Sequence, residues 1–302
     1  MRFGLFGTGH WARDTGAAAI AAHPDAELVG VWGRDLARAQ ALAGDVGARA
    51  YGEIDELIEA VDAIAVALPP DVQAPIAVRA ATAGRHLLLD KPLAFSTRAA
   101  DRIVEAVERA GVRSLVFHTS RFRPEVEDWL REVLDAGDWD GGAVTVLASI
   151  FEPGNPFGQS PWRREKGALW DVGPHALSML LPALGPVDRV LAASGRGDTV
   201  QLALRHASGA SSTALLSLTA PEQTSAWWLY GPRGTSAMPE GPTTAAEAFG
   251  HALTELISGA PAGPAVRSDV RHGRDIVRIL EAADRRRGRV AVAPDSAAQA
   301  GA

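Results

Sequence analysis

Short apolar runs alternate with longer amphipathic segments over the first part of the chain. A brief apolar run predicts a buried strand, whereas apolar residues that recur every three or four positions predict a helix packed against it. The predicted strands are residues 2–6, 27–32, 62–68, 86–89 and 113–117, and the predicted helices are residues 11–22, 36–43, 54–59, 72–83 and 97–110. Strands separated by helices in this way favour an α/β fold with a parallel, doubly wound sheet.

The pattern changes after residue 119. The segments that follow are a helix (124–136), a strand (143–151), a polar loop (152–164), an apolar helix ending near residue 181, four strands (188–194, 200–206, 211–218, 225–230), two helices (245–258, 269–287) and a small-residue tail (293–302) expected to fray. Strands without intervening helices, with a hairpin signal at Ser208-Gly209, predict a large, mainly antiparallel sheet. The 302 residues suffice for two domains, placed at 1–119 and 120–302, and the closing helices can pack back on the first.

A glycine-rich turn joins the first predicted strand to the first helix. Its sequence is Gly7-Thr8-Gly9-His10-Trp11-Ala12. Gly7 permits a tight turn, Gly9 leaves the backbone open to a pyrophosphate, and Ala12 lets the helix pack close to the strand. The helix N-terminus then offers free N–H groups to the phosphates. The turn predicts dinucleotide binding, and the alternative is an ordinary turn that uses glycine for shape alone.

The end of the second predicted strand bears on the choice of dinucleotide. An acidic side chain here would bond the ribose 2′-hydroxyl of NAD, but the chain has Gly33-Arg34, which opens space and offers a guanidinium to a 2′-phosphate. Arg38, one helical turn later, adds a second positive charge. Asp35 is expected to cap the next helix, although it could instead take the ribose. These residues favour NADP over NAD.

Two more strand ends meet the same edge of the sheet. They carry Leu68-Pro69-Pro70 and Asp90-Lys91-Pro92. Ligands of doubly wound sheets lie beyond the carboxyl ends of the strands, and the proline after Lys91 restricts the backbone that holds it. Lys91 is therefore a candidate for chemistry, the alternative being a solvated surface lysine. Asp171 and His175 lie four residues apart around Gly173 and Pro174, a spacing that favours proximity.

Composition narrows the class of partner. The chain has a net charge of −6 and no basic run longer than three residues, which argues against nucleic acid and anionic membranes. It has no cysteine, which excludes disulfides and Cys-based zinc sites, and no metal site is expected. No signal peptide is expected, and the sequence has no run of ~18 apolar residues. We expect a soluble, cytoplasmic protein that acts on a small molecule.

Three motifs together resemble those of a known family. They are Gly7-x-Gly9-x-x-Ala12, then Ala83-Gly84-Arg85-His86 leading to Asp90-Lys91-Pro92, and Asp171-x-Gly173-x-His175. Over nearly its whole length the chain is similar to the glucose-fructose oxidoreductase / inositol dehydrogenase / MocA (Gfo/Idh/MocA) family of NAD(P)-dependent oxidoreductases. The resemblance implies a Rossmann domain followed by an α+β domain, whose open sheet commonly joins subunits into a homodimer or homotetramer.

The resemblance also implies roles for individual residues. Lys91, Asp171 and His175 are the catalytic candidates, and Trp162 and Arg163 are expected to approach the nicotinamide or substrate. Leu68, Pro69, Gln73 and Asp90 belong to the expected cofactor site. The chain departs from the family pattern at four positions: Asp90 replaces a usual Glu, Gln73 a frequent His, Pro70 a common Asn and Ser178 an acidic residue.

These residue types fit hydride transfer at a secondary alcohol or ketone of a sugar or polyol. His175, with an ordinary pKa near ~6.5, would accept or return the hydroxyl proton. Lys91 would stabilise the developing alkoxide, and Asp171 would orient His175 or bind a neighbouring hydroxyl. Two alternatives remain open: a glycoside hydrolase that uses NAD transiently, and a dinucleotide-binding sensor without catalysis. Residues 227–230 are expected to place aromatic side chains on both faces of the second sheet, the outer ones in a subunit interface.

Overall fold

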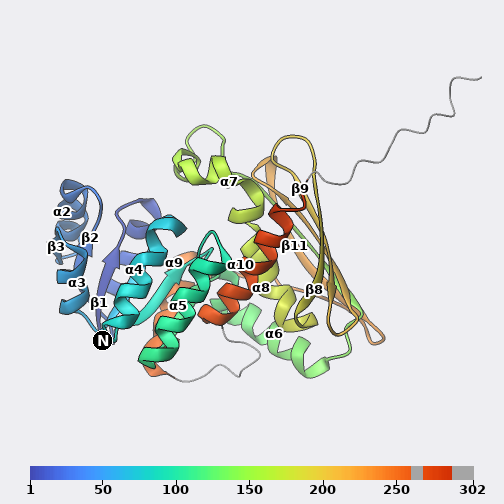
Figure 1. Cartoon of the computed structure of the whole chain (residues 1–302), viewed down its shortest axis with the longest axis horizontal. Helices are drawn as coiled ribbons and strands as arrows, with labels where there is room; N and C mark the ends of the chain where they lie inside the picture. Colours follow the sequence, from blue (N-terminus) through green and yellow to red (C-terminus); the bar gives the residue numbers. More distant parts are fainter. Residues whose placement is uncertain (260–267, 288–302) are drawn as a thin grey trace, which may run out of the picture.

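A six-stranded parallel sheet forms the first lobe of the protein (Figure 1). The computed structural model describes residues 1–259 and 268–287. The strands are β1 (Arg2–Phe6), β2 (Glu27–Trp32), β3 (Arg49–Tyr51), β4 (Ala63–Val66), β5 (His86–Asp90) and β6 (Ser114–Phe117), in the order β3-β2-β1-β4-β5-β6. From β1 the strands follow one another to one side as β2 and β3, and then to the other side as β4, β5 and β6. The prediction of a doubly wound sheet is confirmed.

Helices cover both faces of this sheet, which explains its apolar strands. They are a π-helical turn η1 (Ala12–Ala17), α1 (Ala18–Ala22), α2 (Leu36–Asp45), α3 (Ile54–Ala60), α4 (Pro70–Thr82) and α5 (Thr97–Ala110). Helix α5 shows how the sequence sets its limits: Ser96 caps the first turn by accepting from Ala99 N, and Gly111 ends the helix with φ of 65°. Because the strands are parallel, their carboxyl ends share one edge of the sheet, and the helices begin beyond that edge.

The second lobe is a mixed sheet with helices on its inner face. Its elements are the 3₁₀ turn η2 (Thr119–Phe122), α6 (Pro124–Ala136), β7 (Gly141–Ser149), the 3₁₀ turn η3 (Pro156–Gln159), α7 (Pro161–Asp171), α8 (Gly173–Leu184), β8 (Val187–Ser194), β9 (Val200–His206), β10 (Ser211–Ser217), β11 (Thr219–Gly231) and β12 (Gly234–Ala237). The strand order is β12-β11-β7-β10-β9-β8. Only β7 and β10 pair in parallel, so the prediction of a mainly antiparallel sheet is confirmed.

The two faces of the second sheet differ. On the inner face, α8 packs on β7 and β10, and α10 (Val270–Asp284) packs on β8. On the outer face no described helix covers the strands (Figure 1), and Leu191, Trp228 and Tyr230 are 64%, 44% and 39% exposed. Trp227, one position before Trp228, is buried, as the alternation of a strand requires. The prediction of aromatic side chains on both faces is confirmed.

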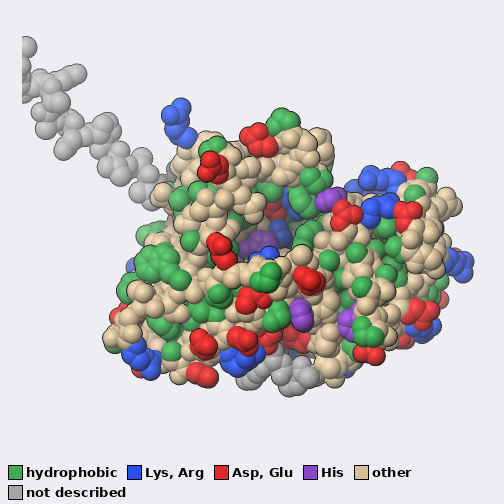
Figure 2. All heavy atoms as spheres, turned by 180° about the vertical axis from the view of Figure 1, so that it is seen from behind, with side chains coloured by type: hydrophobic (Ala, Val, Ile, Leu, Met, Phe, Trp, Pro, Cys, Tyr) green, Lys and Arg blue, Asp and Glu red, His purple; other side chains and the backbone are tan. Residues whose placement is uncertain are grey.

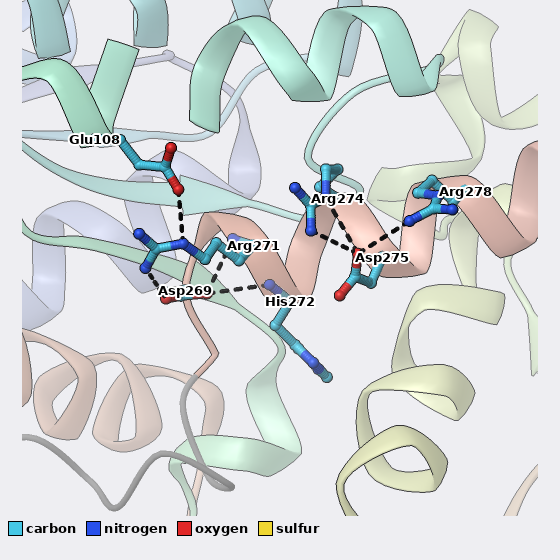
Figure 3. Close-up of polar contacts among 7 residues, drawn as sticks. All are labelled: Glu108, Asp269, Arg271, His272, Arg274, Asp275 and Arg278. Atoms are coloured by element: carbon cyan, nitrogen blue, oxygen red, sulfur yellow. Dashed lines mark hydrogen bonds and ion pairs between the residues drawn. The ribbon is translucent and has the colours of Figure 1, made fainter. Parts of the chain in front are cut away.

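The last two described helices return to the first lobe. In α9 (Ala245–Ser258), the ring of Phe249 packs 4.9 Å from that of Phe117. At the start of α10, Asp269 caps the helix, and Arg271 Nε donates to Glu108 of α5 at 2.8 Å (Figure 3). These contacts tie the two lobes together. Within the described ranges, 1–259 and 268–287, no helix combines the length and apolar character needed to cross a membrane.

Several expectations from the sequence are wrong. Residues 152–164 were expected to form a loop, but they contain η3 and the start of α7, because Pro161 can open a helix where its missing N–H is not needed. The short strands β3 and β12 were not predicted. The sequence alone suggests a surface or helix-end position for His206, but this residue is buried, with its two ring nitrogens bonded to Gly185 O and Ser212 Oγ. The tail 293–302 lies outside the described residues.

Candidate active site

A cavity of about 750 Å³ lies where the two lobes meet. Figure 2 shows this side of the molecule as a hollow with cationic and histidine side chains at its floor. The first lobe contributes Trp11, Asp90 and Lys91 to the lining, and the second contributes residues of α7, α8, β7 and β11. The segment between β6 and α6 supplies Thr119, Ser120 and Arg123. The cavity therefore lies beyond the carboxyl ends of the parallel strands, as predicted.

Three glycines at the strand ends, Gly7 and Gly9 in the glycine-rich turn and Gly33 after β2, differ in what a side chain would meet there. Gly7 has φ of +135°, and a Cβ there would lie 2.5 Å from Ala67 O. A Cβ on Gly33 would lie 2.5 Å from Thr8 Cγ2. A Cβ on Gly9, by contrast, would meet no atom within 4 Å. The chain does not itself require glycine at position 9, so the open space there fits a dinucleotide pyrophosphate.

Aromatic side chains of this turn reach the second lobe. His10 Nδ1 lies 2.6 Å from Asp14 Oδ2, and its ring packs at 5.4 Å against Phe157 of η3. Trp11 packs against the same Phe157 ring at 6.1 Å. Phe157 also lines the cavity, although it belongs to no motif of the sequence. These contacts bring η3 over the expected phosphate site.

Beyond the end of β2 the chain has two exposed arginines and an aspartate whose side chain caps the next helix. Asp35 Oδ1 accepts hydrogen bonds from Ala37 N and Arg38 N at 3.0 and 3.2 Å, which confirms its role as a helix cap. The side chains of Arg34 and Arg38 are exposed, and neither forms an ion pair with any residue the structure describes. Leu68 and Pro69 lie at the end of β4, where Pro69 leads into α4.

Gln73 holds the lysine-bearing turn from behind. Its side chain is fully buried, its Nε2 donates to Asp90 O at 2.8 Å, and its Oε1 accepts from Asp90 N at 2.8 Å. Nε2 is also 3.3 Å from Pro92 O and from Leu93 O. Gln73 was expected in the cofactor site, but its amide is bonded to backbone and does not line the cavity. Its contribution is to fix the position of Lys91.

Asp171 joins cations from both lobes. Lys91 Nζ donates to Asp171 Oδ1 at 2.7 Å and to Asp171 O at 2.8 Å, and Arg163 Nε donates to Oδ2 at 3.0 Å. Burial pushes the pKa of Asp171 upward, but Lys91 and Arg163 outweigh it and hold the pKa below its usual range. Asp171 is therefore a buried carboxylate that orients Lys91. Asp171 was expected to orient His175 or to bind a neighbouring hydroxyl of the substrate; in the structure, its carboxylate oxygens accept hydrogen bonds from the two cations.

His175 lines the cavity from the first turn of α8. Burial lowers the pKa of its imidazole to about 3, and the charge of Lys91 adds to the shift. The expectation of an ordinary pKa is wrong, because the ring is enclosed between the lobes beside cations. At neutral pH the imidazole is uncharged and can accept a proton, although its lowered pKa makes it a weak base. Asp90, also in the lining, has its pKa raised to about 6 by burial, against the opposing charges of Lys91 and Arg163.

The cavity gathers all three predicted catalytic residues but not all the cofactor candidates. Lys91, Asp171, His175 and Arg163 line it together. Trp162 does not line it, because its indole packs against Phe95 at 5.6 Å. The remaining candidates lie at the neighbouring strand ends or in the helical turns that follow them; they are Gly7, Thr8, Gly9, His10, Ala12, Gly33, Arg34, Arg38, Leu68 and Pro69. Sequence reasoning did not identify Arg123, Phe157 or Trp227 as cavity residues, since none of them belongs to a motif.

Comparison with family models follows the two lobes. Residues 1–118 match an oxidoreductase family with an NAD-binding Rossmann fold, and residues 112–237 match the GFO/IDH/MocA C-terminal domain. The chain belongs to the Gfo/Idh/MocA family of oxidoreductases. The motifs on which the resemblance was based, Gly7–Ala12, Asp90–Pro92 and Asp171–His175, fall within these matched ranges.

Two relatives in this family act on sugars. The chain is 32% identical to a dTDP-3,4-didehydro-2,6-dideoxy-alpha-D-glucose 3-reductase of Streptomyces violaceoruber, over 67% of this chain and 59% of the relative. It is 32% identical to D-xylose 1-dehydrogenase (NADP(+)) 2 of Haloferax volcanii, over 64% and 60%. The alignments thus span about three fifths of the length of each relative.

Solved structures share the fold of both lobes. A putative myo-inositol dehydrogenase from Sinorhizobium meliloti superposes with a TM-score of 0.80 at 22% identity, covering 95% of this chain and 97% of the other. A Bordetella pertussis dehydrogenase in complex with NADH and UDP-GlcNAcA superposes with a TM-score of 0.80 at 24% identity, covering 95% of each chain. At this identity the likeness is one of fold.

Proposed function

We propose that this oxidoreductase transfers a hydride between a nicotinamide dinucleotide and a secondary alcohol or ketone of a sugar, polyol or related small molecule. The observation that carries the proposal is the bond between Lys91 Nζ and Asp171, which places an ammonium from the first lobe in the same cavity as the imidazole of His175. The sugar reductase and the xylose dehydrogenase among the relatives support a substrate of this kind.

The chain's own residues supply the proton chemistry. A bound nicotinamide would supply or accept the hydride. In the direction of oxidation, the neutral His175 accepts the hydroxyl proton, and the ammonium of Lys91 stabilises the developing alkoxide. Asp171 keeps that ammonium in place, and Arg163 holds the other carboxylate oxygen. In reduction the same groups act in reverse, with the proton returned to the product oxygen.

For the cofactor we propose NADP in preference to NAD. Arg34 and Arg38 are exposed beside Gly33 at the end of β2, and Asp35 is already engaged as a helix cap. In titrations monitored by tryptophan fluorescence, Arg34→Ala should weaken NADPH binding roughly tenfold and leave NADH binding nearly unchanged. Arg2→Ala, at the amino end of β1, is the matched control. Equal affinity of the wild type for both dinucleotides would contradict the preference.

We also propose that a second copy of the chain covers the outer face of the second sheet, giving a homodimer or homotetramer. Leu191, Trp228 and Tyr230 leave an apolar surface on this face, which a subunit interface would bury. Light scattering of the wild type should give a multiple of the chain mass. Trp228→Glu should shift the protein towards the monomer, whereas a wild-type monomer would contradict the proposal.

The central test is turnover. The protein should bind NADPH or NADH and, with a panel of sugars, inositols and keto-sugars, should change the absorbance of the reduced nicotinamide in proportion to product. Hydrolysis of a glycoside without net cofactor reduction would indicate the NAD-using hydrolase instead. Dinucleotide binding without turnover of any alcohol or ketone in the panel would indicate a sensor.

A further inference from the structure

Two buried N–H groups in the wall of the cavity lack an acceptor. Arg123 Nε and Trp227 Nε1 are both buried, and neither has a hydrogen-bond partner among residues 1–259 and 268–287. Both residues line the same cavity as Lys91 and His175. They come from different parts of the second lobe, Arg123 from the junction of η2 and α6 and Trp227 from β11.

Such groups are rare in folded proteins. More than nine tenths of buried backbone polar groups, and most buried side-chain polar atoms, are paired, and leaving a donor unpaired is unfavourable. Among the buried side-chain atoms without a partner in the described residues, these two donors belong to residues that line the cavity, whereas the acceptor Glu125 Oε1, two positions from Arg123, lies outside that lining. A ligand that supplies acceptors would satisfy them.

The charges around the cavity make Arg123 distinctive. Lys91 and Arg163 are both bound to Asp171, whereas Arg123 forms no ion pair in the described part of the chain. Its neighbour Glu125 accepts a hydrogen bond from Thr243 at 2.8 Å, and the charge of Arg123 helps to hold the pKa of Glu125 below its usual range, but the two side chains do not form an ion pair. The guanidinium of Arg123 is therefore a positive charge still available to a ligand.

The acids in the lining do not supply the missing partner. Asp171 is held by Lys91 and Arg163, and Asp90 Oδ1 accepts from Lys91 N at 2.8 Å. Glu240 lines the cavity but is exposed to solvent. The wall near Arg123 and Trp227 thus offers hydrogen-bond donors and one cation that has no ion pair with the described residues.

We propose that Arg123 and Trp227 bind an anionic oxygen group of the substrate, a carboxylate or a phosphate, so that the substrate is an acidic sugar derivative. The inference rests on the proposed hydride-transfer function and names its substrate class. A carboxylate or phosphate accepts several hydrogen bonds and donates none when ionised, which matches two donors and a guanidinium. A neutral hydroxyl could also accept from the two donors, but it carries no charge to pair with the guanidinium.

The experiment compares matched acidic and neutral sugars. Binding of D-glucuronate, D-glucose 6-phosphate and D-glucose to the protein saturated with NADPH or NADH is measured by calorimetry. We expect at least one acidic sugar to bind roughly tenfold or more tightly than D-glucose, since a charge-assisted hydrogen bond is worth about that much. Whichever acidic sugar binds more tightly, D-glucuronate or D-glucose 6-phosphate, shows whether the recognised group is a carboxylate or a phosphate.

Three variants test the two residues. Arg123→Met should lower the ratio of acidic to neutral affinity roughly 10- to 100-fold, and Arg123→Lys should restore part of it. Trp227→Phe, which keeps the ring and removes the N–H, should lower the ratio by a few-fold, about 3 to 10. Arg131→Met is the control for net charge, because Arg131 lies on the exposed face of α6 and pairs with Asp128. Dinucleotide affinity and melting temperature report whether each variant is folded.

The outcomes separate this inference from the proposed function. If D-glucose binds as well as both acidic sugars, or if Arg123→Met and Arg131→Met change the ratio equally, the inference is wrong. If the protein turns over neutral sugars and shows no preference for acidic ones, the hydride-transfer function stands and the proposed anion-binding role of Arg123 and Trp227 is wrong. Arg123-dependent binding of an acidic sugar without turnover supports the inference and ends the hydride-transfer proposal.

Discussion

The two walls of the interlobe cavity are built by different means. The wall from the first lobe is shaped by backbone: Gly7 and Gly33 allow close approaches, Gly9 leaves open space, and Gln73 fixes the turn before Lys91 through main-chain bonds. The wall from the second lobe is made of side chains with charge or unpaired donors, among them Arg123, Asp171 and His175. Lys91 is the point at which the two walls are bonded to each other.

This difference predicts that the walls can be disabled separately. A change in backbone shape on the first wall should affect dinucleotide affinity, because the pyrophosphate is recognised by main-chain groups. A change of side chain on the second wall should affect turnover, because proton transfer and charge stabilisation depend on particular functional groups. The predictions below test that separation, beginning with the bond that joins the walls.

Lys91→Met should lower kcat about a thousandfold or more, because the cation that stabilises the alkoxide is lost. The affinity for the dinucleotide, measured separately by fluorescence, should change little. Lys166→Met is the control, since Lys166 lies outside the cavity over the ring of Phe95. Wild-type turnover in Lys91→Met would remove the lysine from the mechanism.

The same substitution also leaves Asp171 buried with one cation fewer. Removing one partner of a buried ion pair destabilises a protein by about 3–5 kcal/mol, so Lys91→Met should also lower the melting temperature. The double variant Lys91→Met/Asp171→Asn should recover stability without recovering turnover. Recovery of both would show that the lysine acts only through folding.

His175→Gln should lower kcat about a hundredfold, since a positioned general base contributes about 10²–10⁴ to the rate. Glutamine keeps a polar side chain of similar reach but cannot accept the proton. The control is His251→Gln on α9, where the histidine is exposed and lies outside the cavity. If kcat and its dependence on pH are the same in His175→Gln and the wild type, another group is the base.

Gly9→Val should weaken dinucleotide binding by roughly 10- to 100-fold, because the side chain would fill the space left for the pyrophosphate. It should leave the melting temperature nearly unchanged, since a Cβ there meets no atom within 4 Å. Gly7→Val is the matched contrast: its φ of +135° and the 2.5 Å approach to Ala67 O should make the fold itself less stable. Equal effects in both variants would contradict the distinction drawn between the two glycines.

The two walls were also unequally predictable from sequence. The first lobe follows rules local in the chain: strand, glycine turn and helix recur in order, and the strand ends necessarily share one edge. Gly9 and Lys91 could therefore be placed without a structure. Gln73 could not, because its burial behind the lysine turn depends on how α4 packs on β5.

On the second wall, the sequence pointed to Asp171 and His175 only through their resemblance to a family motif. Their surroundings depend on contacts between distant segments, which spacing does not reveal. Lys91 and Asp171 are separated by 80 positions. The proximity of these charges, with burial, also gives His175 a pKa far from its ordinary value. Arg123 and Trp227 carry no motif, so they became candidates only when the cavity and their missing partners were known.

The smallest expected effect is on the pH dependence of stability. Asp90 on the first wall and His175 on the second change the free energy of unfolding in opposite directions as the pH falls. Asp90, with its pKa raised to about 6, favours folding most at low pH, and that contribution is lost as pH rises through 6. His175, with its pKa lowered to about 3, favours folding most above its ordinary pKa, and that contribution is lost as pH falls. Between roughly pH 4 and 6 the two oppose each other, each by up to about 1.4 kcal/mol per pH unit.

Two substitutions separate these contributions. The free energy of unfolding, followed in urea from pH 6.5 to pH 4, should fall more steeply on acidification in Asp90→Asn than in the wild type, and less steeply in His175→Gln, by up to about 1.4 kcal/mol per pH unit in each case. His251→Gln should match the wild type, because that imidazole is exposed. Parallel curves for all four proteins would show that neither buried group changes its protonation on folding. The two walls would then differ in how they are built but not in how they change stability with pH.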